Sequence, residues 1–115
     1  MVTDIWFRSS SSLEDLAAAL HLKDYHYDCE NYWEWIIGGL DAAKIDITRT
    51  HTMPAAETDT RIFRYEEDRK IEPSLETRIV EALHEHGIDD VISGEWLFTS
   101  ENDFEKVVSE IHTRT

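Results

Sequence analysis

An antiparallel sheet is predicted most directly by residues 24–39, which read DYHYDCENYWEWIIGG. In both halves of this stretch large apolar side chains occupy every second position, a period typical of β-strands. The pair Gly38-Gly39 interrupts the pattern and marks the end of the second strand. We therefore predict two paired strands, over residues 24–28 and 32–37.

The register of this pair follows from the rule that directly opposed residues share one face of a sheet. A three-residue loop over 29–31 places Tyr27 opposite Trp33 and Tyr25 opposite Trp35, so we expect these four rings on the core side. The outer face then carries the remaining pairs, His26 with Glu34 and Asp28 with Tyr32.

The rest of the chain alternates between the two kinds of periodicity. Further strands are predicted around residues 4–8, 44–50, 61–66 and 90–98. A helix is predicted after Ser11, because Ser11-x-x-Glu14 fits a capping box. A second runs from Pro73 to Gly87, which suits a left-handed helix end. A third is predicted after Ser100, with Phe104, Val107, Val108 and Ile111 along one stripe.

These elements define an α+β protein with the order β-α-β-β-β-β-α-β-α. We expect a mixed, mostly antiparallel sheet with the helices packed on it, and two β-α-β crossovers, around residues 4–28 and 61–98. A length of 115 residues suits one core, so residues 1–115 are predicted to form a single globular domain.

Cellular location is predicted from what the sequence lacks. Cys29 is the only cysteine, which rules out an intrachain disulfide. The first residues show no basic segment followed by an apolar run, as a signal peptide would. No apolar stretch approaches the roughly 20 residues that span a bilayer. We therefore expect a cytoplasmic protein.

The net charge of −14 is the most unusual property of the composition. A surface this acidic repels phosphate backbones and anionic lipid, so direct binding to nucleic acid or to membranes is not expected. The acids are also segregated. Residues 24–43 hold five acids and residues 79–105 hold eight, and neither stretch contains a Lys or Arg.

Catalytic and metal-binding patterns are weak. No P-loop, GxGxxG, GxSxG or HExxH is present. His84 and His86 are two residues apart on a predicted helix, so they point in different directions and cannot chelate one ion. We predict no catalytic residues, no metal site and no cofactor. One alternative stays open, a small hydrolase or metal-dependent enzyme centred on His51, with Asp59 and nearby arginines.

The acidic stretches also carry large aromatic residues, the combination that protein interfaces favour around a basic partner. The predicted partner-binding residues are Asp24, His26, Asp28, Glu30, Tyr32, Glu34, Asp89, Asp90 and Glu95. In size, charge and fold class the chain resembles the bacterial immunity proteins. That resemblance implies an antitoxin that neutralises a nuclease-type toxin by direct binding. An adaptor or regulatory domain with another basic partner is the second alternative.

Overall fold

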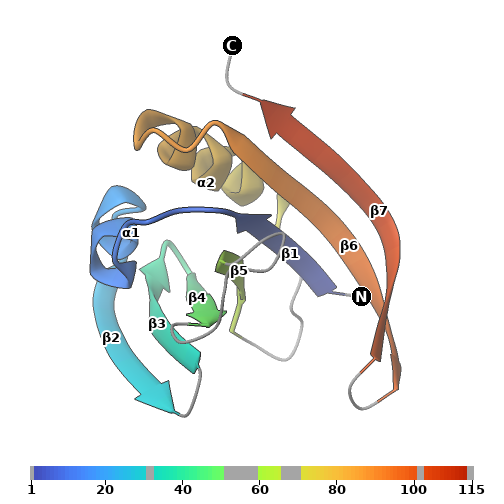
Figure 1. The fold of residues 1–115 in the computed structure, drawn as a ribbon, viewed down its shortest axis with the longest axis horizontal. Coiled ribbons are helices and arrows are strands. Elements are labelled where there is room, and N and C mark those ends of the chain that lie inside the picture. Colours follow the sequence, from blue (N-terminus) through green and yellow to red (C-terminus); the bar gives the residue numbers. More distant parts are fainter. Residues whose placement is uncertain (1, 31–32, 51–59, 66–70, 101–102, 114–115) are drawn as a thin grey trace.

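The structure is a computed structural model that describes residues 2–30, 33–50, 60–65, 71–100 and 103–113. Within these residues, seven strands and two helices follow one another (Figure 1). Their bounds are β1 (Val2–Phe7), α1 (Leu13–Ala19), β2 (Lys23–Glu30), β3 (Trp33–Leu40), β4 (Ala43–Thr50), β5 (Thr60–Arg64), α2 (Pro73–Glu85), β6 (Asp90–Ser100) and β7 (Asp103–Thr113). The α+β class and the order of the first eight elements are as predicted.

The strands form one curved sheet in the order β2-β3-β4-β5-β1-β6-β7. Every neighbouring pair in it is antiparallel. Strands β5 and β6, which are joined through α2, lie on either side of β1. Because each is antiparallel to β1, they run parallel to one another without touching. Counting along the sheet, β1 and β2 are parallel as well. Both predicted crossovers are therefore present, and each passes over at least one strand.

The core lies between the helices and one face of the sheet. Ile36, Ile47, Ile62 and Ile5 are successive cross-strand partners on β3, β4, β5 and β1, and all four are fully buried. They share one cluster with buried residues of both helices, so α1 and α2 cover the same face. Burying one such side chain stabilises the folded state by about 1.5–3 kcal/mol. These four isoleucines therefore form the centre of the core.

Both helices end in the same way. At the end of α2, the N–H of Ile88 donates to the carbonyl of Leu83 and that of Gly87 donates to His84, with Gly87 at a φ of 94°. This is the predicted left-handed end with a buried hydrophobic residue after it. At the end of α1, His21 takes the glycine position, with a φ of 58°.

The start of α1 differs by one residue from the prediction. The N-cap is Ser12, whose hydroxyl accepts the Asp15 N–H at 3.1 Å, rather than Ser11. A run of four serines gives several equivalent caps, and the buried positions of Leu13, Leu16 and Ala17 decide between them.

Two larger predictions are wrong. The segment predicted as a third helix is strand β7, which pairs with β6 along its length. The register of the β2–β3 hairpin is shifted, so that Tyr27 faces Ile36, Asp28 faces Trp35 and Glu30 faces Trp33. The tryptophans consequently share a face with Asp28 and Glu30, away from the tyrosines. Trp33 is 50% exposed and does not belong to the core.

Candidate functional site

Strand β2 forms one edge of the sheet and is exposed along its whole length. It pairs with β3 on one side, and all eight of its side chains are exposed. It carries three carboxylates, Asp24, Asp28 and Glu30, and one cation, Lys23. Four of the predicted partner-binding residues therefore lie on this strand: Asp24, His26, Asp28 and Glu30.

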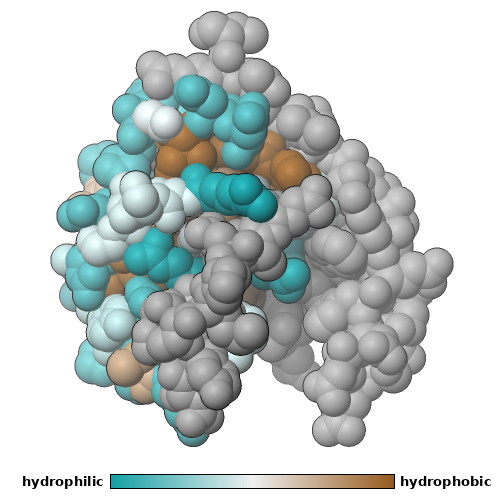
Figure 2. Space-filling view, in the orientation of Figure 1, coloured by the Kyte–Doolittle hydropathy of each residue, from teal (hydrophilic) through white to brown (hydrophobic). Residues whose placement is uncertain are grey.

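The hairpin also concentrates exposed aromatic rings. Among the described residues, the large hydrophobic side chains that are exposed are Tyr25 (44%), Tyr27 (41%), Trp33 (50%) and Tyr65 (51%). Three of these four lie on β2 and β3. Figure 2 shows that the described surface on the side in view is mostly hydrophilic, with a few hydrophobic patches. Exposed aromatic rings beside carboxylates are suited to a protein partner of opposite charge.

The surroundings of Tyr27 alter the pKa of its side chain. The pKa of its phenol is raised above the usual value, first by desolvation and then by the negative charge of Glu34, with smaller effects from Cys29 and Glu14. Tyr27 is the cross-strand partner of the fully buried Ile36, so it lies on the helix-covered side of the sheet. Asp28 points to the other side, and its carboxylate accepts the backbone N–H of Cys29 at 2.8 Å.

Glu34 has a different environment from the acids of β2. Its carboxylate is 3.5 Å from the Arg49 guanidinium, and the two side chains are only 13% and 15% exposed. Arg49 also donates to the backbone carbonyl of Ser11 at 2.6 Å. This chain of contacts ties the hairpin to the start of α1, so Glu34 acts in the fold more than at the surface.

A pocket of about 770 Å³ adjoins the start of β2. Its walls include Asp24 and His26 from β2, Lys44 from β4 and the ion pair between Arg78 and Asp41. His21, Asp24 and Asp41, which all have a positive φ, line this pocket. Mixed charge on its walls gives it no clear preference for an anion or a cation.

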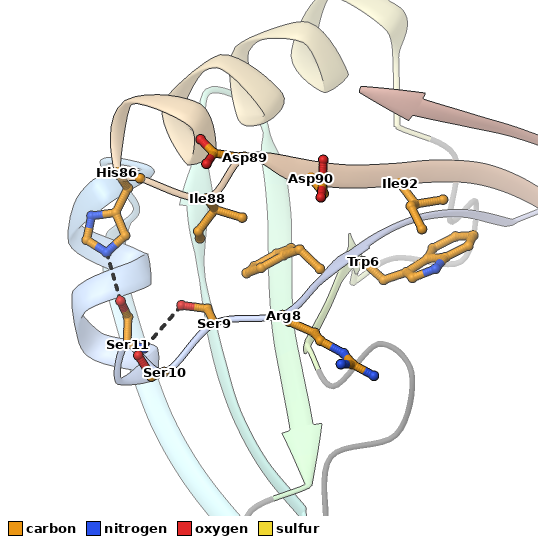
Figure 3. Close-up of a pocket in the computed structure, with 12 residues that line it drawn as sticks. Trp6, Arg8, Ser9, Ser10, Ser11, His86, Ile88, Asp89, Asp90 and Ile92 are labelled. Carbon is orange, nitrogen blue, oxygen red and sulfur yellow. Dashed lines mark hydrogen bonds between the residues drawn. The ribbon is translucent and has the colours of Figure 1, made fainter. Parts of the chain in front are cut away.

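The second acidic stretch lies elsewhere. Asp89 and Asp90 line a pocket of about 840 Å³ between the β1–α1 connection and the start of β6 (Figure 3). His86 points towards Ser11 there, and its Nε2 is 3.0 Å from the Ser11 hydroxyl. No hydrogen bond to a carboxylate orients the His86 ring in the part of the chain that is described, so the pair lacks the third member of a catalytic triad.

The structure therefore does not unite the two acidic stretches in one surface. Strands β3, β4, β5 and β1 lie between β2 and β6. Glu95 is on β6 opposite Thr3, and its side chain, like Tyr32, His51 and Asp59, lies outside the described residues. Over those that are described, no three His, Cys, Asp or Glu side chains form a metal-binding group.

Sequence reasoning missed most residues of both pockets. Arg8 and Ser11 line one pocket with His86, which comes from a distant part of the chain, and Lys44, Tyr65 and Arg78 line the other from three separate segments. No local pattern could have indicated these groupings, because they depend on the strand order.

Comparisons with known proteins add no family. No protein-family model matches the chain, and the searches of curated proteins and of solved structures gave no match. In the described residues, neither helix is long and apolar enough to cross a membrane.

Proposed function

We propose that this chain is a protein-binding module that holds a basic partner at the β2–β3 hairpin. The observation that carries the proposal is an exposed edge strand with three carboxylates and three exposed aromatic rings around it. Acids at the rim attract a basic partner over a distance, and the rings supply contact area once the two proteins meet.

The most concrete form of this function is that of an immunity protein. Toxic nucleases need basic clefts for their phosphate substrates, and an acidic edge can occupy such a cleft or its rim. Electrostatic steering speeds this encounter, which favours capture of the toxin before it reaches nucleic acid. An adaptor for another basic protein would use the same surface but would not inhibit an enzyme.

The proposal is tested by isolating the partner and measuring inhibition. The tagged chain is used to retain proteins from its native lysate at low salt, and the retained protein is identified by mass spectrometry and purified. An immunity protein abolishes nuclease activity at one equivalent. A basic partner without nuclease activity would favour the adaptor, and retention of acidic or neutral proteins alone would contradict both.

The site itself is tested by charge reversal. Asp28→Lys and Glu30→Lys should each lower the association rate, by about tenfold together, because rim charges act mainly on that rate. Glu85→Lys makes the same change in net charge at an exposed position of α2 and is the matched control. Equal effects at all three positions would show that only net charge matters, and would remove the hairpin from the proposal.

A further inference from the structure

We propose that the basic partner binds by strand addition, with an extended segment pairing along the free edge of β2 and continuing the sheet. This inference rests on the proposed function and specifies its binding mode. An edge strand presents unpaired N–H and C=O groups, which can pair with another chain. Strand β2 is such an edge over eight residues, about 27 Å of extended chain.

The backbone groups available on this edge can be identified. The Cys29 N–H donates to the Asp28 carboxylate, so it points away from β3. Backbone groups on alternate residues of a strand point to the same side. The N–H and C=O of Tyr27 therefore point outwards too, whereas those of His26 and Asp28 face β3. Tyr27 is therefore the residue whose N–H and C=O would pair with the added strand, whereas the Cys29 N–H would first have to leave the Asp28 carboxylate.

An irregularity limits the length of the pairing. The register between β2 and β3 shifts between Lys23 and His26, and Asp24 has a φ of 51°. Such a bulge bends the strand and breaks the ladder. Regular pairing is therefore expected over residues 26–30.

The side chains of this stretch define the partner sequence. His26, Asp28 and Glu30 lie on the open face of the sheet, and Tyr27 lies on the helix-covered face with Cys29. Directly opposed residues interact across strands. A segment that alternates Lys or Arg with apolar residues would place its cations against Asp28 and Glu30, and its apolar side chains against Tyr27.

Charge selects this partner over a second copy of the chain. Two β2 strands paired edge to edge over residues 26–30 would bring four carboxylates onto one seam, Asp28 and Glu30 from each copy, with no Lys or Arg in that stretch. Like charges opposite one another destabilise strand pairing. The edge is thus protected from self-association and open to a basic strand.

Synthetic peptides test the inference without a known partner. Four capped octapeptides of four Lys and four Val are compared by isothermal titration at low salt. One alternates the two residues, one has the lysines in a block, and two are alternating peptides N-methylated either on every Lys or on every Val. Strand addition predicts that the alternating peptide binds about tenfold more tightly than the block peptide. It also predicts that methylation of one set of residues, Lys or Val, abolishes this gain while methylation of the other set spares it.

A change in the protein tests the same contact. Tyr27→Pro removes the outward N–H as well as the ring, whereas Tyr27→Ala removes the ring alone. Proline is tolerated on an edge strand where its nitrogen faces solvent, and equal thermal midpoints for the two variants confirm that the fold is intact. Binding of the alternating peptide should be weaker for Tyr27→Pro than for Tyr27→Ala. The amide of Tyr27 in the wild-type protein should also exchange more slowly when the peptide is bound.

The outcomes separate the binding mode from the function. Equal binding of the alternating and block peptides, or no change in Tyr27 exchange, overturns strand addition and leaves the proposed function standing. Failure of every peptide to bind also overturns strand addition. The proposed function fails on a different result, a partner whose association is unaffected by Asp28→Lys and Glu30→Lys.

Discussion

Gly38 is the residue on which the close approach of β2 and β3 depends. A Cβ at this position would lie 2.8 Å from the Cβ of Tyr25 and 3.0 Å from that of Leu22. Neither contact involves the flexible end of a side chain, so the two strands would have to separate. The adjacent Gly39 is different, because its nearest neighbour would be the Lys23 carbonyl at 3.6 Å.

This contrast gives a matched pair of variants. Gly38→Ala should lower the free energy of unfolding by about 1–3 kcal/mol, the usual cost of overpacking a well-packed site. Gly39→Ala should change it by less than about 0.5 kcal/mol, as most surface substitutions do. Urea denaturation with an unchanged slope measures both. Equal costs at the two positions would contradict the close approach at Gly38.

Tyr27 reports on the electrostatic field of the hairpin. Because its pKa is raised by desolvation and by Glu34, the folded protein should keep the phenol proton to a higher pH than the unfolded chain. The free energy of unfolding should then fall as pH rises above about 10, where unfolded tyrosine loses its proton. Glu34→Gln should move the Tyr27 midpoint downwards, and Glu85→Gln should leave it unchanged.

Ring-labelled tyrosine followed by NMR measures these midpoints, with Tyr27→Phe assigning the signal. A Tyr27 midpoint at or below that of the denatured protein would contradict the raised pKa. An unchanged Tyr27 midpoint in Glu34→Gln would show that Glu34 does not contribute to the raised pKa.

At the scale of elements, the sequence predicts best what local contacts decide. Both helices and their ends follow from caps and spacing within a few residues, as at Gly87 and Ile88. Six of the seven strands were predicted within a few residues of their bounds. These signals do not depend on which strands become neighbours.

The hairpin register failed because both faces of its strands carry large side chains. Period-two alternation identifies a strand but tells the two faces apart only if one of them is polar. Here Ile36 is fully buried and Trp35, on the opposite face, is half-buried. The loop length therefore had to decide the register, and the last pair is Glu30 with Trp33 rather than Asp28 with Tyr32.

The error at β7 has a related cause. The adjacent Val107 and Val108, spaced from Phe104 and Ile111, match a helical stripe. In the sheet, Val108 pairs with Glu95, Lys106 pairs with Trp96, and Val107 is left over at a register shift. A bulge adds one residue to a strand and so breaks its alternation. Long-range pairing with β6 overrides the local pattern in this case.

The candidate site was predictable in its composition but not in its arrangement. The acids of residues 24–30 were identified from their segregation, and the structure places them together on an exposed edge. Their separation from Asp89 and Asp90 depends on the strand order, which sequence periodicity does not contain. The ion pair of Glu34 with Arg49 likewise follows from the pairing of β3 with β4.

At the scale of the whole molecule, the net charge acts on folding and binding at once. The described fold measures 35 × 33 × 29 Å along its principal axes. The Debye length is about 30 Å at 0.01 M salt and about 8 Å at 0.15 M. At low salt nearly every pair of charges in the molecule therefore interacts, whereas at 0.15 M only near neighbours do.

Salt should consequently move stability and association in opposite directions. With a net charge of −14, repulsion opposes the compact state, so raising salt from about 0.01 to 0.15 M should raise the thermal midpoint. The same change should slow association with a basic partner, because it screens attraction over the approach distance. The double variant Asp28→Asn/Glu30→Gln should weaken the salt dependence of association strongly and that of stability only slightly, since it removes two charges from a net of fourteen.

Thermal melts and stopped-flow association measured across one salt series provide both slopes. A midpoint that falls with salt would mean that ion pairs such as Arg49–Glu34 and Arg78–Asp41 outweigh the repulsion. An association rate indifferent to salt would mean that the acidic edge does not steer its partner.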